Sequence, residues 1–83
     1  MKRHKSLVEM KQGEIGVIVD ICGGRALCQR LAAMCIIPGA RLRKITRSFV
    51  KGPVTVQVGN ARVALGFGMA AKITLEVEKG ITQ

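Results

Sequence analysis

A turn between a helix and a strand constrains this chain more than any other feature. In the stretch 30–45 the first part has helical spacing, the last part alternates like a strand, and Pro38-Gly39 lies between them. Proline fixes φ and glycine tolerates positive φ, so this pair must turn the chain. Ile36 and Ile37 precede the turn as an apolar anchor, and a basic strand follows it. The corner therefore offers both a core contact and a charged face.

Short segments of alternating hydrophobicity predict the rest of the fold. A helix is expected at 25–34, and strands are expected at 14–22, 40–47, 54–58, 61–65 and 72–78. Gly59-Asn60 separates two of these strands as a hairpin turn. In the first strand the alternation groups Ile15, Val17, Val19 and Ile21 on one face, and in the last strand it points Ile73, Leu75 and Val77 inward.

Closure into a barrel removes the exposed edges that five short strands would otherwise leave. We therefore predict a mainly β fold, a small SH3-like β-barrel of about five strands with a short α-helix inserted after the first strand. The expected domain is 7–78, between a basic flexible tail at 1–6 and a C-terminal tail at 79–83. A chain of 83 residues buries only about 60% of its unfolded surface, so a large active-site cleft is not expected.

Positive charge is concentrated in the middle of the chain. The formal net charge is +9, and no Asp or Glu occurs between Asp20 and Glu76. Such a field favours an acidic protein surface, an anionic membrane surface or a nucleic acid as partner.

The cysteines indicate a reducing compartment and no metal site. Cys22, Cys28 and Cys35 form no Cys-x-x-Cys pair, and their apolar neighbours predict burial rather than metal binding. The N-terminal residues lack the apolar segment of a signal peptide, and the apolar runs are shorter than the ~20 residues of a membrane span. We expect a cytoplasmic protein without a cofactor.

Residues for catalysis are also scarce. The single histidine, His4, falls in the predicted tail, and the cysteines have no positioned base. Gly66 to Gly68 is not followed by the Lys-Ser/Thr of a phosphate-binding loop. The sequence therefore predicts no enzyme activity.

Several short motifs occur in a characteristic order. They are Gly13-Glu14, Gly23-Gly24, Arg30-Leu31, Met34-x-Ile36-x-Pro38-Gly39, Gly52-Pro53-Val54, Ala64-Leu65-Gly66 and Met69-Ala70-x-x-Ile73. Together, from about Leu7 to Val77, they resemble the FeoA family. The resemblance implies a cytosolic SH3-like accessory protein of bacterial ferrous iron uptake that acts on the membrane transporter FeoB, and it does not imply catalysis.

The chain departs from the family pattern at Cys35, where the family usually has glycine after the methionine of the corner. If this position ends the helix with a positive φ, a side chain there is strained by ~1 kcal/mol. Either the backbone differs here or the strain is tolerated.

The leading hypothesis is a binding module that docks on a FeoB-type transporter from the cytosolic side. The candidate contact residues are the corner, the basic strand and their neighbours: Ile36, Ile37, Pro38, Arg41, Arg43, Lys44, Arg47, Phe49 and Lys51. Phe49 and Val50 lie next to the basic strand. An exposed apolar residue ringed by arginines is typical of an interface core with a polar rim. A charge run is equally often only a solvated face.

The alternative is a small basic barrel that binds nucleic acid through phosphate contacts. With no Trp or Tyr and two Phe, the chain has almost no platform for stacking bases, so such binding would be steeply salt-dependent. Self-association into a homo-oligomer through a spare barrel edge is compatible with either hypothesis.

Overall fold

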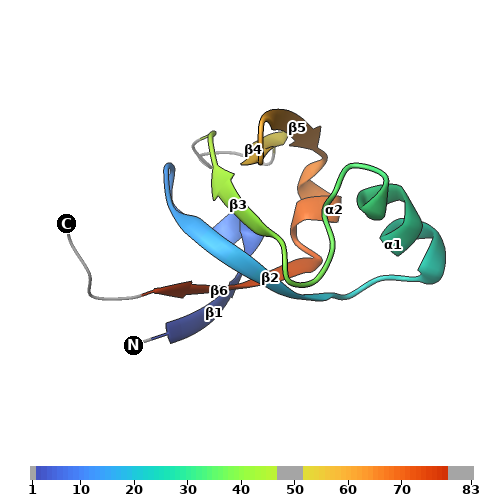
Figure 1. Ribbon diagram of the computed structural model, residues 1–83, viewed down its shortest axis with the longest axis horizontal. Helices are drawn as coiled ribbons and strands as arrows, with labels where there is room; N and C mark the ends of the chain where they lie inside the picture. Colours follow the sequence, from blue (N-terminus) through green and yellow to red (C-terminus); the bar gives the residue numbers. More distant parts are fainter. Residues whose placement is uncertain (1, 47–51, 79–83) are drawn as a thin grey trace.

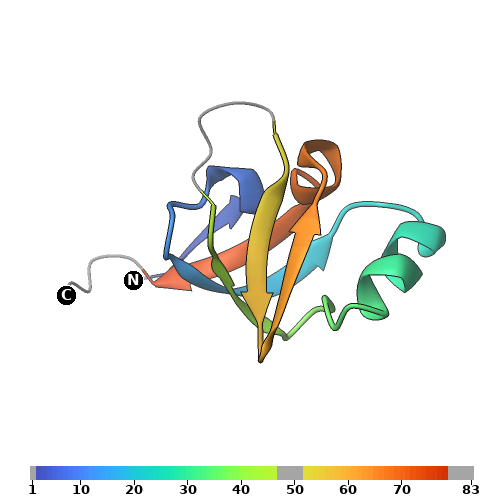
Figure 2. The same ribbon diagram turned by 90° about the horizontal axis from the view of Figure 1, so that it is seen from above.

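The computed structural model describes residues 2–46 and 52–78. Within them, six strands form one antiparallel sheet in the order β1-β6-β2-β3-β4-β5, which curls into a small barrel (Figures 1 and 2). The elements in chain order are β1 (Lys2–Ser6), the 3-10 helix η1 (Leu7–Glu9), β2 (Ile15–Ile21), α1 (Arg25–Ala32), β3 (Arg41–Lys44), β4 (Val54–Val58), β5 (Ala61–Leu65), α2 (Phe67–Ala70) and β6 (Ile73–Glu78). None of the helices in these described ranges is long and apolar enough to cross a membrane.

The hairpin and the last strand form as predicted. Val58 pairs with Ala61 across Gly59-Asn60, and Gly59 takes the positive φ of 60° that this tight turn requires. In β6, the side chains of Ile73, Leu75 and Val77 are almost fully buried. These two segments carried the clearest alternation in the sequence, which explains why their prediction was correct.

The prediction of a tail at 1–6 was wrong for residues 2–6. Lys2–Ser6 form β1, which pairs with β6 along its whole length, from Lys2 opposite Glu78 to Ser6 opposite Thr74. Lys5 of this strand also pairs with Glu14, at 3.3 Å between Nζ and Oε1. The segment carries no apolar alternation that would have predicted a strand. As an edge strand it can be charged, and its structure is fixed by the hydrogen bonds to the neighbouring strand β6.

The inward face of β2 is the opposite of the one that its apolar residues suggested. Ile18 is 1% exposed and Gly16 is buried, whereas Ile15 is 41% exposed. Gly16 is needed inside because a Cβ there would lie 2.9 Å from Cγ1 of Val77 and 3.1 Å from Cβ of Leu75. The register with β6 then shifts between Ile18 and Asp20. The resulting arrangement leaves branched aliphatic side chains of β2 on the outside of the barrel.

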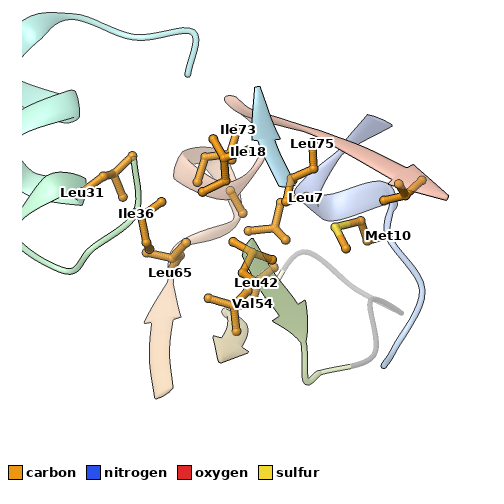
Figure 3. Packing of buried hydrophobic residues seen from close by; sticks show 13 residues of the cluster. Leu7, Met10, Ile18, Leu31, Ile36, Leu42, Val54, Leu65, Ile73 and Leu75 are labelled. Atoms are coloured by element: carbon orange, nitrogen blue, oxygen red, sulfur yellow. The ribbon is translucent and has the colours of Figure 1, made fainter. Parts of the chain in front are cut away.

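A single apolar core fills the barrel (Figure 3). Leu31 and Ile36 lie at the end that meets α1, Leu7 and Met10 extend the core beneath η1, and Leu42 and Val54 lie between them (Figure 3). Leu7 and Met10 are 0% and 3% exposed. The core reaches from the N-terminal segment to the helix-to-strand corner, so the corner is anchored on the barrel.

Helix α1 ends in a Schellman motif built around Cys35. The amide of Ile36 donates to the carbonyl of Leu31, and the amide of Cys35 donates to the carbonyl of Ala32, both at 2.9 Å. Cys35 has a φ of 65°. Among the residues that the structure describes, it is the one non-glycine residue with a positive φ. The motif also brings together Leu31 and Ile36, which are both fully buried. The positive φ that glycine would supply in the family pattern is therefore retained here, although Cys35 carries a side chain.

Replacing Cys35 with glycine is expected to raise the free energy of unfolding by roughly 0.5–1 kcal/mol. Glycine removes the left-handed strain, and little packing is lost because Cys35 is exposed. The matched control is Ala33→Gly, two residues earlier at a φ of −63°, where glycine should destabilise by roughly 0.5–1 kcal/mol because it adds only unfolded-state entropy. Chemical denaturation of both variants measures the two changes, and a destabilised Cys35→Gly protein would contradict the strain at this position.

Candidate docking face

An open groove lies over β2 and β3, on the face of the sheet that carries the side chains of Ile15, Arg41 and Arg43. Its volume is about 540 Å³, and it is lined by Ile15, Arg41, Leu42, Arg43, Gln57 and Gly59. We call it the arginine groove. These residues come from β2, β3, the end of β4 and the hairpin turn. The side chain of Gln57 donates to the carbonyl of Gly59 at 3.3 Å, which ties β4 to the turn at one end of the groove.

The strand register sets two parallel tracks of side chains on the outer face of β2 and β3, and Ile15, Arg41 and Arg43 of these tracks line the groove. Ile15 is opposite Arg43, and Val17 is opposite Arg41. Residues two apart on a strand share a face, so Arg41 and Arg43 form an arginine track on β3, and Ile15 and Val17 form an apolar track beside it on β2. Both arginines are exposed. Directly opposed strands are about 4.8 Å apart, so one bound chain can touch both tracks.

Within the part of the chain that the structure describes, no neighbouring carboxylate neutralises the positive charge of the arginine groove. Among residues 2–46 and 52–78, no ion pair is formed by Arg41 or Arg43. The nearby carboxylates have other partners: Glu14 pairs with Lys5 and accepts from the amide of Lys11 at 2.8 Å, and Glu76 lies 3.4 Å from Nε2 of His4. The groove therefore presents two guanidinium groups that are available to an anion.

The exposed half of the corner continues the apolar track. Ile37 is 46% exposed and Pro38 is exposed. The segment that contains them runs beside β2, because the amide of Gly39 donates to the carbonyl of Ile18 at 2.7 Å and the amide of Ile18 donates to Ala40 at 2.9 Å. Among the described residues, the large apolar side chains that are exposed are Ile15, Val19 and Ile37. All three belong to β2 or to this adjoining segment.

The structure divides the contact residues suggested by the sequence. Ile37, Pro38, Arg41 and Arg43 are exposed and remain candidates. Ile36 and Lys44 are each 0% exposed, which corrects their assignment to a partner-facing surface. Ile36 belongs to the core, as the apolar anchor of the corner. Arg47, Phe49 and Lys51 lie outside the described residues.

Lys44 has a structural position inside the barrel. Its Nζ donates to the carbonyls of Met10 at 2.8 Å and Val8 at 3.1 Å, and thereby fastens the segment after η1 to β3. Burial lowers the pKa of Lys44 below its ordinary value of 10.5; the carboxylate of Glu14 opposes this shift, and the charge of Lys5 adds to it. The sequence contained the signal for burial, because Lys44 shares its face of the strand with Leu42.

The expected burial of the cysteines was wrong. Cys22 and Cys35 are exposed and Cys28 is half-buried. Cys22 follows the end of β2, and Cys35 occupies the left-handed turn, while Leu27 and Leu31 supply the apolar face of α1 and leave Cys28 at its edge. Within the described part of the chain, no three His, Cys, Asp or Glu residues are grouped so that they could hold a metal ion.

Sequence reasoning did not find Ile15 and Gln57 as parts of the site. Period-2 alternation groups residues by face but does not say which face is inside. The signal that decides it is Gly16, because a glycine within a strand indicates close approach of another backbone. Once Gly16 is placed inside, Ile15 must lie outside and next to Arg43.

Comparison with known proteins gives consistent matches. Residues 5–77 match the model of the FeoA domain. A protein of Methanocaldococcus jannaschii, provisionally named Fe(2+) transport protein A, is 35% identical over 66 residues, which cover 80% of this chain and 78% of that protein.

Solved structures match along most of the chain. The crystal structure of an iron uptake regulatory protein (FeoA) has a TM-score of 0.81 at 34% identity and covers 88% of this chain and 96% of its own. The zinc complex of Stenotrophomonas maltophilia FeoA, described as a prokaryotic SH3 domain protein, has a TM-score of 0.73 at 22% identity and covers 90% and 98% of the two chains. The latter likeness shows the fold alone, and it confirms the predicted SH3-like barrel.

Proposed function

The chain belongs to the FeoA family, and from this premise we propose that it is an accessory protein of ferrous iron transport that binds the cytoplasmic side of a FeoB-type transporter. Its role in this proposal is a protein contact, without catalysis, in the cytoplasm. The named relatives support the link to iron, since one is an Fe(2+) transport protein and another an iron uptake regulatory protein.

The observation that carries the proposed contact is the arginine groove with its exposed apolar neighbours. Exposed apolar side chains that lie together and are rimmed by polar residues are typical of interaction sites on a folded domain. Ile15 and Ile37 are 41% and 46% exposed, and exposed arginines lie between them on β3. Apolar anchors bordered by arginines match the composition of protein interfaces, in which arginine is enriched.

The proposal is tested by binding to the isolated cytosolic region of a FeoB-type transporter, with bulk RNA as competitor, at low and at physiological salt. Wild-type protein should be retained by the transporter at both salt concentrations despite the RNA. Reversing two charges of the groove, Arg41→Glu with Arg43→Glu, should weaken binding roughly 100-fold, because like charges then face an acidic partner.

The matched control reverses two charges elsewhere, Arg25→Glu with Arg30→Glu on α1, where both arginines are exposed. This control changes the net charge equally and should leave the Kd within a few-fold. Capture by RNA in place of the transporter would favour the nucleic-acid alternative. Equal binding by the groove variant and the wild type would remove the arginine groove from the contact.

A further inference from the structure

The arginine groove has a shape and a charge pattern that select one kind of ligand. Arg41 and Arg43 are two residues apart on β3, so their side chains leave the same face roughly 6.8 Å apart. An extended chain also repeats its side chains every second residue at about this distance. Carboxylates at alternate positions of an extended segment therefore match the arginine track, and each guanidinium can bind a carboxylate through two hydrogen bonds.

The apolar track selects the other side of the same segment. In an extended chain, neighbouring residues point in opposite directions. A segment lying over the seam between β2 and β3 thus places its acidic side chains on the arginine track and its intervening side chains toward Ile15 and Val17. Ile15 is 41% exposed and directly opposite Arg43, so an aliphatic side chain of the ligand would shield it from water.

We propose that the arginine groove binds an extended acidic segment in which acidic and aliphatic residues alternate. The inference rests on the proposed function, since it names the chemistry of the transporter segment that docks here. A nucleic-acid strand fits the site less well, because Ile15, which lines it, offers neither a hydrogen bond nor a flat ring for stacking. The volume of about 540 Å³ also suits a short peptide, being within the range of roughly 300–1,000 Å³ of ligand sites.

A blocked hexapeptide of alternating leucine and glutamate is the probe, titrated into ¹⁵N-labelled protein at 150 mM salt. The control peptide has the same composition, with three leucines followed by three glutamates. The alternating peptide should shift the amides of Ile15, Arg41 and Arg43 and should bind at least five-fold more tightly than the control. Equal binding of the two peptides, or shifts confined to other surfaces, would overturn the inference.

Two pairs of variants locate the binding. Arg41→Gln with Arg43→Gln should weaken the peptide roughly 100-fold, at about ten-fold per arginine, whereas Arg25→Gln with Arg30→Gln on α1 should leave it within two-fold. Ile15→Thr should weaken the peptide several-fold, whereas Val63→Thr, at a half-buried position on β5 outside the groove, should not. All these side chains are exposed or partly exposed, so the variants should fold, and their thermal unfolding checks this.

The same protein is measured in parallel against the cytosolic region of the transporter. If wild-type protein binds the transporter but not the alternating peptide, the acidic-segment inference fails and the proposed function stands. If it binds the peptide in the groove but not the transporter, the inference stands and the proposed partner fails. Tighter binding of an RNA oligonucleotide than of the peptide in this groove would overturn the inference in favour of a phosphate ligand.

Discussion

Replacement of Lys44 with alanine is expected to lower the free energy of unfolding by about 3 kcal/mol. The side chain is fully buried, and its Nζ donates to the carbonyls of Val8 and Met10. Hydrogen bonds from a charged donor contribute about 1.5–3 kcal/mol each, and the desolvation of the ammonium offsets part of their sum. For a domain of this size the loss corresponds to a fall in Tm of roughly 15 °C.

Lys44→Met separates packing from polar contacts. Methionine fills most of the same space, so this variant should lose less than the alanine variant, about 1–2 kcal/mol, from two carbonyls left without this donor. Hydrogen exchange should rise in the segment from Leu7 to Met10 in both variants, because that segment is what Lys44 holds. A Lys44→Ala protein as stable as the wild type would show that the buried amine is dispensable.

The lowered pKa of Lys44 gives a pH dependence with a definite sign. Burial puts the folded-state pKa below the 10.5 of the ordinary lysine, so between these two values the unfolded chain binds more protons than the folded one. Stability therefore rises with pH across that interval, because the cost of holding a buried ammonium disappears as it deprotonates.

Methionine does not titrate, so the stability difference between wild type and Lys44→Met should grow in favour of the wild type as the pH rises toward 10.5. The control is Leu42→Met, at a buried residue on the same face of β3, for which the difference should stay flat over the same range because neither side chain titrates. Urea denaturation at a series of pH values measures both. A difference that shrinks with rising pH would reverse the sign assigned to burial.

The sequence predicted those parts of the fold in which local pattern and tertiary environment agree. β6 and the hairpin at Gly59 combine clear alternation with the appropriate turn residue, and both form as expected. β1 was missed because its order comes from pairing with β6, a long-range contact that leaves no mark on a charged segment. The face of β2 was assigned wrongly for a similar reason, since the close approach of β6 at Gly16 outweighs the number of apolar residues.

The sequence predicted only part of the candidate site, because charge alone does not show whether a side chain is exposed. Charge identified Arg41 and Arg43 as surface residues, and their exposure confirms this. Charge also placed Lys44 on the surface, although its position on the inward face of β3 favoured burial. A long amine can be buried where two carbonyls lie within its reach, and those carbonyls belong to a segment more than thirty residues away. No local pattern contains such a partner.

Ile36 and Ile37 offer the sharpest separation of stability from binding in this chain. Ile36 is 0% exposed and packs at the Schellman turn with Leu31, whereas its neighbour Ile37 is 46% exposed. Ile36→Ala should therefore cost about 3 kcal/mol of unfolding free energy, from lost burial and the cavity left behind. Ile37→Ala should change it by less than about 0.5 kcal/mol, because water already covers much of that side chain.

The effects on the partner should be reversed. At a temperature where both variants are folded, Ile37→Ala should weaken binding to the transporter region several-fold, because its side chain belongs to the proposed docking face. Ile36→Ala should bind like the wild type, since its side chain contacts only the core. Denaturation curves and binding titrations on the same two proteins measure both effects. Weaker binding by Ile36→Ala with no change for Ile37→Ala would mean that the corner acts through the packing of α1 on the barrel and that the partner contacts another face.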